Sequence, residues 1–210
     1  MRIAVVNEVS AVDKNNDIME ALSDRGHSVL NAGMQNKSDT PELLYTHTGF
    51  ISALLLNAGE ADFVVGGCGT GQGFLNSVMQ YPGVVCGLIL GPLDAWLFAQ
   101  INAGNCLSLA LNQGYGWAGN VNLRFIFDRL FSVERGAGYP AHRKEPQREG
   151  RQALELVSLA AHKPFAEIVT ALPAAVAGPS LRFLRDRVGL DLAAIADDQL
   201  AAACLKRVNE

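Results

Sequence analysis

No stretch of this sequence is apolar for long enough to cross a membrane. A membrane helix requires roughly 20 consecutive apolar residues, whereas the richest stretch, residues 84–93, includes two glycines and a proline. At the N-terminus the unbroken apolar run extends only from Ile3 to Val6, which is shorter than a secretory signal peptide requires. We therefore expect no membrane span, no signal peptide and no membrane partner.

Cysteine is scarce, and its spacing forms no recognisable pattern. The four cysteines include no C-x-x-C pair and lack the spacing of a zinc site, and a chain of 210 residues does not depend on disulfides. A chain-wide basic face is also missing, because the formal net charge is -4. We therefore expect no metal site, a reducing cytoplasmic location and no nucleic-acid partner.

Apolar residues are plentiful enough for a sizeable core. Hydrophobic residues make up 49% of the chain and charged residues 18%, which excludes a disordered chain. Over residues 1–134, short apolar runs alternate with segments of helical periodicity, and residues 39–41 (Asp-Thr-Pro) form a helix-start signature. The expected strands cover residues 3–6, 28–30, 63–65, 84–90 and 107–111. This alternation predicts an α/β fold, a Rossmann-like three-layer sandwich with a five-stranded parallel sheet.

The composition changes near Glu134. Residues 135–151 are interrupted by glycine and proline and concentrate arginine and lysine. Residues 152–210 are rich in alanine and leucine and show no strand alternation. We expect three parts: an α/β domain over residues 1–134, a basic linker over residues 135–151 and a helical C-terminal extension over residues 152–210.

A glycine-rich turn ends the third expected strand. Five of the eight residues from Gly66 to Gly73 are glycine. In an open parallel sheet, ligands bind beyond the carboxyl ends of the strands, and the backbone N–H groups of such a turn can converge on an anion. The turn fits neither a dinucleotide fingerprint, because Gln72 and Phe74 occupy the places of its third glycine, nor a Walker sequence. It predicts an oxyanion or phosphate cradle, and the alternative is a plain strand-to-helix turn.

Cys68 adds a reactive group to this turn. A thiol near a helix N-terminus forms thiolate more readily. A thiolate can remove a proton from carbon while neighbouring N–H groups stabilise the resulting oxyanion. An aldose–ketose isomerase requires that pairing for its enediolate. The alternative is a small buried cysteine, which is the role we expect for Cys86 and Cys106.

The stretch from Cys68 to Leu109 resembles the type B ribose-5-phosphate isomerases and the related galactose-6-phosphate isomerase subunits. It matches them without gaps through C-G-T-G-x-G, Pro82-Gly83, Pro92, Gln100-x-Asn102 and Asn105-x-Leu107. A weaker resemblance extends over residues 2–131. It implies a small-molecule sugar or sugar phosphate as substrate, and an active site at the interface of a homodimer or dimer of dimers. It also implies no metal and no organic cofactor.

The resemblance further implies roles for individual residues. Cys68 would transfer the proton between C1 and C2, and Thr70 would assist the opening of the sugar ring. The residues that would bind the substrate or its enediolate are Tyr45, Gly69, Gly71, Gly73 and Asn102.

Three segments depart from the family pattern. Glu8 keeps a carboxylate able to hold a sugar hydroxyl, but Val9 replaces the histidine associated with the substrate phosphate. Ile101 stands where the family has its ring-opening histidine. In the basic segment, Arg143 could anchor a phosphate and His142 could replace the lost proton shuttle, and the alternative is a solvated linker.

Three functions remain open from the sequence. The first is an aldose–ketose sugar isomerase, acting on a sugar or sugar phosphate through an enediolate with a cysteine base. The second is an epimerase-like enzyme on a related sugar or sugar acid. The third is a non-catalytic sugar-binding or partner subunit. We favour the first over the third, because a silent subunit has no physical need for an activated thiol.

Overall fold

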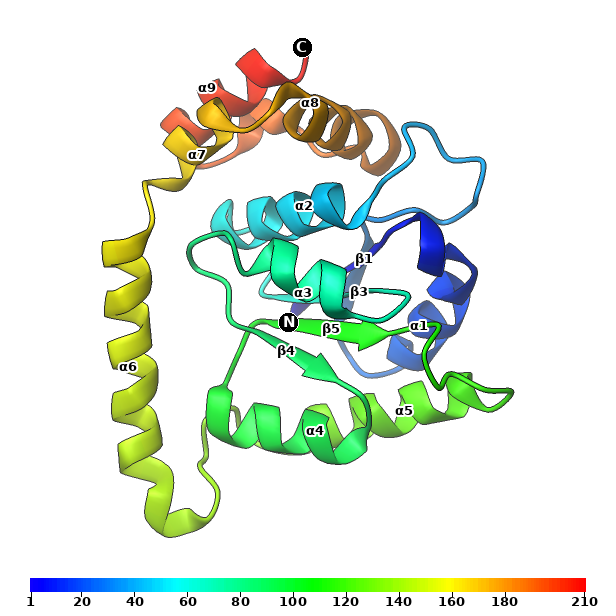
Figure 1. Ribbon diagram of the computed structural model, residues 1–210, viewed down its shortest axis with the longest axis vertical. Helices are drawn as coiled ribbons and strands as arrows, with labels where there is room; N and C mark the ends of the chain where they lie inside the picture. Colours follow the sequence, from blue (N-terminus) through cyan, green and yellow to red (C-terminus); the bar gives the residue numbers. More distant parts are fainter.

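The structure, a computed structural model, describes all residues from 1 to 210. Its centre is a single sheet with the strand order β2-β1-β3-β5-β4 (Figure 1). The strands are β1 (Arg2–Asn7), β2 (Ser28–Asn31), β3 (Phe63–Cys68), β4 (Cys86–Ile89) and β5 (Cys106–Ala110). Every pairing is parallel, so the carboxyl ends of all five strands lie along one edge of the sheet.

Helices cover both faces of this sheet. α2 and α3 lie on one face, and α1, α4 and α5 lie on the other (Figure 1). The bounds are η1 (Val9–Lys14, 3₁₀), α1 (Asn15–Leu22), α2 (Tyr45–Asn57), α3 (Gln72–Val78), α4 (Pro92–Leu97), η2 (Phe98–Asn102, a π-helix) and α5 (Gly119–Leu130). The predicted three-layer sandwich with five parallel strands is confirmed. Coverage on both faces explains why the central strands are continuous apolar runs.

Beyond α5 the chain forms an arm and then a helical cap. The arm is α6, which runs along one side of the molecule, and the later helices lie over α2 (Figure 1). The bounds are η3 (Ala141–Arg143, 3₁₀), α6 (Lys144–Ala161), α7 (Phe165–Ala171), α8 (Ala174–Phe183), η4 (Leu184–Val188, a π-helix), η5 (Leu192–Ala194, 3₁₀) and α9 (Asp198–Arg207). The predicted helical extension is therefore present, and residues 144–151, expected in the linker, form the first part of α6. No helix combines the length and the apolar character that crossing a membrane demands.

α2 is enclosed between the sheet and the C-terminal extension. All residues from 47 to 55 are buried. On the outer side, the ring of Phe165 in α7 packs 6.3 Å from that of Phe50 and 6.1 Å from that of Tyr81, measured between ring centroids. A helix that is apolar all round is typical of such full burial. The extension and the α/β part consequently share one hydrophobic core.

α2 begins later than the helix-start signature at residues 39–41 predicts. The carboxylate of Asp39 turns back and accepts the N–H groups of Gln35 at 2.7 Å and Asn36 at 2.9 Å. The first turn of α2 is capped instead by His47, whose Nδ1 accepts the backbone N–H three residues before it at 2.9 Å. The prediction was wrong because an aspartate near a proline can close a loop as well as begin a helix.

Gly67 in β3 lies too close to β5 to carry a side chain. A Cβ at Gly67 would lie 2.4 Å from the carbonyl oxygen of Leu109, and neither strand can retreat without breaking the sheet. Gly67→Ala should therefore lower the free energy of unfolding by about 3 kcal/mol. Gly150→Ala in α6 is the matched control, because its Cβ would meet nothing within 4 Å and alanine favours a helix by about 1 kcal/mol. Denaturant unfolding measures both, and an undiminished stability of Gly67→Ala would contradict the close packing.

Candidate active site

The carboxyl ends of β1 and β3 lie side by side. Asn7 and Gly67 are register partners in the two strands, so Glu8 and the turn over residues 68–71 leave the sheet together. Ligands of open α/β sheets bind beyond this edge. The structure thus brings Glu8 and the glycine-rich turn, which the sequence assigned to one site, to the same place.

Ser10 connects Glu8 to the turn. Its backbone N–H donates to Glu8 Oε2 at 3.1 Å, and its hydroxyl donates to the other carboxylate oxygen. The same hydroxyl accepts the N–H of Gly69 at 3.1 Å, and the side-chain amide of Asn112 donates to the Ser10 carbonyl at 2.7 Å. Glu8 is 4% exposed, so this network fixes a buried carboxylate.

Sequence reasoning missed Ser10 and Asn112. Ser10 lies 59 residues before its partner Gly69, and Asn112 lies 102 residues after its partner Ser10. No local pattern marks either residue, because only the sheet brings these segments together.

The glycine-rich turn is held by its own backbone. Gly71 has φ +75° and forms the N-cap of α3, a conformation that glycine adopts without strain. Its N–H donates to the Cys68 carbonyl at 3.3 Å, and the Thr70 hydroxyl accepts the N–H of Gln72 at 3.3 Å. Two N–H groups expected to bind an enediolate, those of Gly69 and Gly71, therefore have protein partners in this structure. Thr70 itself is exposed.

Tyr45 lies against the same turn. It is the first residue of α2, and a Cβ at Gly73 would lie 3.1 Å from Tyr45 Cγ. The glycine at position 73 therefore allows the ring to lie on the first turn of α3. The side chain of Tyr45 remains 47% exposed, so its ring can face a ligand at this edge.

Cys68 is the last residue of β3 and is 7% exposed. The other cysteines lie elsewhere in the fold. Cys86 and Cys106 begin β4 and β5, at the opposite edge of the sheet, and Cys204 lies in α9. Burial raises the pKa of Cys204 to about 12. Burial, together with a smaller effect of a hydrogen bond to Cys86, raises the pKa of Cys106 well above its usual value. These thiols therefore stay protonated at neutral pH. No group of three or more histidine, cysteine, aspartate or glutamate side chains is placed to hold a metal ion.

Asn102 and Arg143 lie at the opposite edge of the sheet from Cys68. Asn102 ends η2 just before β5 begins, and β5 pairs with β3 from the level of Val64. Four residues of strand separate that level from Cys68, which corresponds to about 13 Å. The structure therefore does not bring Asn102 to the Cys68 of its own chain.

Arg143 is tied to the same distant edge. Its segment is bound to η2 through the Gly138 N–H, which donates to the Gln100 carbonyl at 2.9 Å. Arg151 Nη1 also donates to the Ile101 carbonyl at 2.8 Å. Each chain thus carries two separate groups of predicted site residues, one at each edge of the sheet.

Comparison with known proteins identifies one family and several similar structures. The family model described as Ribose/Galactose Isomerase matches residues 3–128. A crystal structure of a 4-deoxy-L-threo-5-hexosulose-uronate ketol-isomerase, complexed with a tartrate, superposes with a TM-score of 0.93 at 33% identity, covering 100% of both chains. A ribose-5-phosphate isomerase from Vibrio parahaemolyticus gives a TM-score of 0.83 at 38% identity, covering 99% of this chain and 92% of that one.

A more distant structure shares the fold alone. The ribose-5-phosphate isomerase B of Clostridium thermocellum is 19% identical, with a TM-score of 0.65, and its whole length covers 77% of this chain. A comparison with curated proteins gave no match.

The parallel sandwich, the edge with its cysteine-bearing turn and these likenesses together define a sugar isomerase. The chain belongs to the ribose/galactose isomerase family. The resemblance carried by C-G-T-G-x-G and the motifs after it is thereby confirmed.

Proposed function

We propose that the chain is an aldose–ketose isomerase that works through an enediolate, with Cys68 as the proton-transferring base. The observation that carries this proposal is the position of Cys68 at the end of β3, beside Glu8 and the glycine-rich turn. The Cys68 thiolate would take the proton from C2 of the open-chain aldose and leave an enediolate. A proton would then pass from O2 to O1, and Cys68 would return its proton to C1. The product is the ketose, with no atom gained or lost.

The neighbouring groups would bind the sugar. Glu8, held by Ser10, would accept a hydrogen bond from a sugar hydroxyl, and the exposed ring of Tyr45 would line the pocket. The Gly69 N–H would turn from the Ser10 hydroxyl to the enediolate oxygen, a stronger acceptor because it carries charge. Thr70, exposed on the turn, would assist proton movement on the sugar oxygens.

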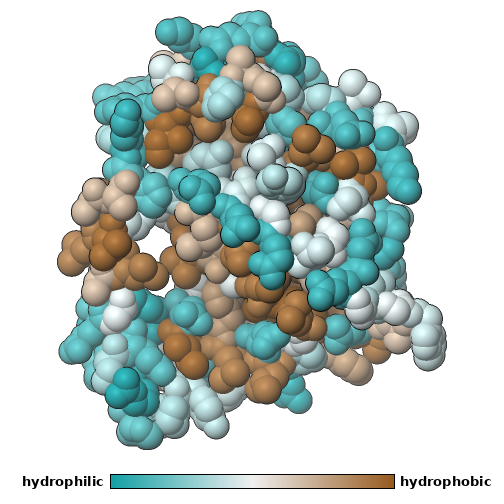
Figure 2. Space-filling view, in the orientation of Figure 1, coloured by the Kyte–Doolittle hydropathy of each residue, from teal (hydrophilic) through white to brown (hydrophobic).

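We further propose that the complete site forms between two copies of the chain. Asn102 and Arg143 of one protomer would reach the Cys68 edge of the other, because neither lies near the Cys68 of its own chain. α6 supports such an assembly: none of its residues is buried, and open space separates part of it from the body (Figure 2). Four large apolar residues of α6 are 51–70% exposed, namely Leu154, Leu156, Val157 and Leu159. A homodimer, or a dimer of such dimers, would cover them.

Two substrate classes follow from the site. A sugar phosphate is one, with Arg143 as the anchor for the phosphate. An open-chain sugar acid is the second, because Ile101 cannot carry the proton that ring opening requires. The full-length likeness to a hexosulose-uronate ketol-isomerase that binds tartrate, an acyclic hydroxy acid, supports the second class. A cytoplasmic location would keep all four cysteines reduced.

The test is deuterium incorporation from heavy water, followed by proton NMR, with a panel of sugars. The panel contains ribose 5-phosphate, galactose 6-phosphate, free pentoses and hexoses, and a 5-keto-hexuronate. Exchange at C1 or C2 is expected for one class, since enediolate formation exposes that proton to solvent whichever product is released. Exchange with the keto-uronate alone would favour the sugar acid. A folded protein that exchanges none of them would favour a non-catalytic binding subunit.

A further inference from the structure

The loop between β2 and α2 holds the backbone on both sides of Glu8. The Met34 N–H donates to the Asn7 carbonyl at 2.9 Å, and the Val9 N–H donates to the Leu43 carbonyl at 3.0 Å. Glu8 lies between these two attachments. The position of its carboxylate therefore depends on the shape of the loop over residues 34–43.

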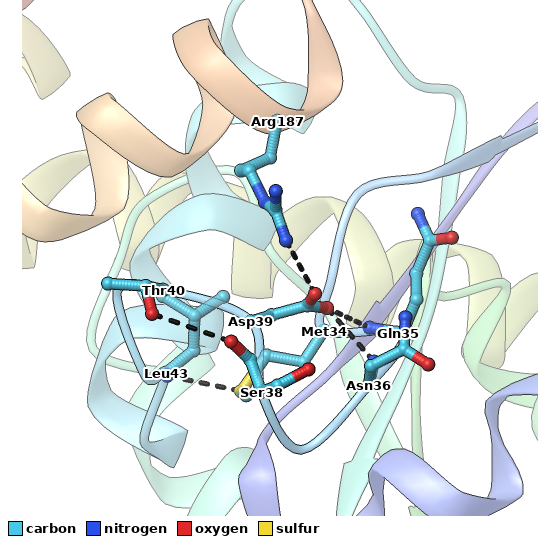
Figure 3. Close-up of polar contacts among 8 residues, drawn as sticks. All are labelled: Met34, Gln35, Asn36, Ser38, Asp39, Thr40, Leu43 and Arg187. Carbon is cyan, nitrogen blue, oxygen red and sulfur yellow. Dashed lines mark hydrogen bonds and ion pairs between the residues drawn. The ribbon is translucent and has the colours of Figure 1, made fainter.

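Asp39 closes this loop, and Arg187 of the C-terminal extension holds Asp39. One carboxylate oxygen of Asp39 accepts the N–H groups of Gln35 and Asn36, and the other accepts Arg187 Nη2 at 2.6 Å (Figure 3). Asp39 is 8% exposed. Burial alone would raise its pKa, but the two backbone donors and Arg187 outweigh burial and hold the pKa below its usual value. The carboxylate is therefore ionised at neutral pH, and the ion pair is intact.

Mostly polar residues line a hollow beside this contact. A cavity of about 270 Å³ lies between the loop and η4, lined by residues 35, 36 and 39 on one side and 183 and 186–188 on the other. The two segments face each other across this space. Across this hollow, the charged hydrogen bond from Arg187 joins the loop to η4.

His47 provides a second link, at the end of the same loop. Because its Nδ1 accepts the Leu44 N–H, its Nε2 carries the hydrogen and donates to the Ala175 carbonyl of α8 at 2.9 Å. Tyr45 lies between Leu44 and His47. One ring therefore joins the start of α2, where Tyr45 meets the glycine-rich turn, to the extension.

We propose that Arg187 is a positioning residue through which the C-terminal extension sets Glu8 in place at the active-site edge. The proposal rests on the function proposed above for that edge. Arg187 does not touch the reacting atoms. It acts on Glu8 through Asp39 and the loop, while His47 holds the end of that loop to the same extension.

The first test needs no substrate, because the Ser10 and Gly69 N–H groups report on Glu8. In Arg187→Ala, amide hydrogen exchange measured by NMR should accelerate about tenfold or more at Gln35 and Asn36, and also at Ser10 and Gly69. Arg187→Lys should restore part of the protection. Arg185→Ala is the matched control, because Arg185 pairs with its neighbour Asp186 in the same π-helix and should change none of these amides.

Acceleration confined to Gln35 and Asn36, or absent, would overturn the proposal, because Arg187 would then have only a local structural role. If Arg187→Ala fails to fold, Asp39→Asn replaces it in the test. The asparagine side-chain oxygen can still accept the backbone N–H groups of Gln35 and Asn36, but the ion pair with Arg187 is lost. With the sugar identified by deuterium exchange, KM should rise about tenfold while kcat changes less, and an unchanged KM would equally contradict positioning. If no sugar reacts, the proposed function fails, and the amide exchange still decides the role of Arg187.

Discussion

Replacing Cys68 with alanine should abolish deuterium incorporation into the sugar, lowering the exchange rate about 10³-fold or more. Alanine has no group that can carry a proton between C2 and C1, and no other thiol lies at this edge of the sheet. Glu8 is engaged by Ser10 and faces the substrate hydroxyls in our assignment. The measurement is the rate of deuterium entry by proton NMR, with substrate binding checked separately by calorimetry.

Cys204→Ala is the control for this variant. Cys204 is fully buried in α9, far along the chain from the turn, and its thiol stays protonated. The exchange rate of Cys204→Ala should equal that of the original protein. If Cys68→Ala kept more than about a tenth of the exchange rate, another base would be acting, and the cysteine mechanism would be wrong.

Two inactive variants should restore each other's activity when they form a mixed dimer. Cys68→Ala damages the carboxyl-edge group of one chain, and Asn102→Ala damages the amino-edge group of the other. The Cys68→Ala dimer should lose about 10³-fold or more in activity, and the Asn102→Ala dimer about 10²-fold or more. A purified heterodimer carrying two different affinity tags should recover about half of the original activity, because in a two-fold dimer one of its two sites is made of intact halves.

The matched control combines two variants of the same edge. A heterodimer of Cys68→Ala and Glu8→Gln contains one damaged residue in each site, and it should stay inactive. Recovery in this control as well would mean that Glu8 is dispensable for the reaction. If the first heterodimer does not recover activity, the site is not shared between two chains. Asn102 would then have no catalytic residue beside it.

The sheet could be predicted from sequence because its signals are local. Short apolar runs bounded by glycine or polar residues marked each strand, and the switch to helical spacing marked the crossovers. The start of α2 could not be predicted in this way. Asp39 has the right residues after it for a helix cap, but its carboxylate partners are Gln35, Asn36 and, 148 residues away, Arg187.

The candidate site divides in the same manner. The glycine-rich turn and Cys68 form one continuous motif, so the sequence alone could predict them as candidates. Ser10 and Asn112 acquire their partners only when β1, β3 and β5 lie side by side. The separation of Asn102 from Cys68 also depends on strand direction, since all five strands point the same way and one residue precedes a strand while the other ends one.

The enclosed position of α2 has a consequence for how this protein is made. Phe50 and its neighbours become buried only when Phe165 and the helices after it pack over them. The shared core includes residues as late as Val208. Because the N-terminal part of the chain leaves the ribosome first, the five strands are complete while α2 is still uncovered. The apolar outer face of α2 stays exposed until the C-terminal helices have emerged. Chains that terminate early should keep that surface open, and they become candidates for chaperone binding or aggregation although every strand of the sheet is present.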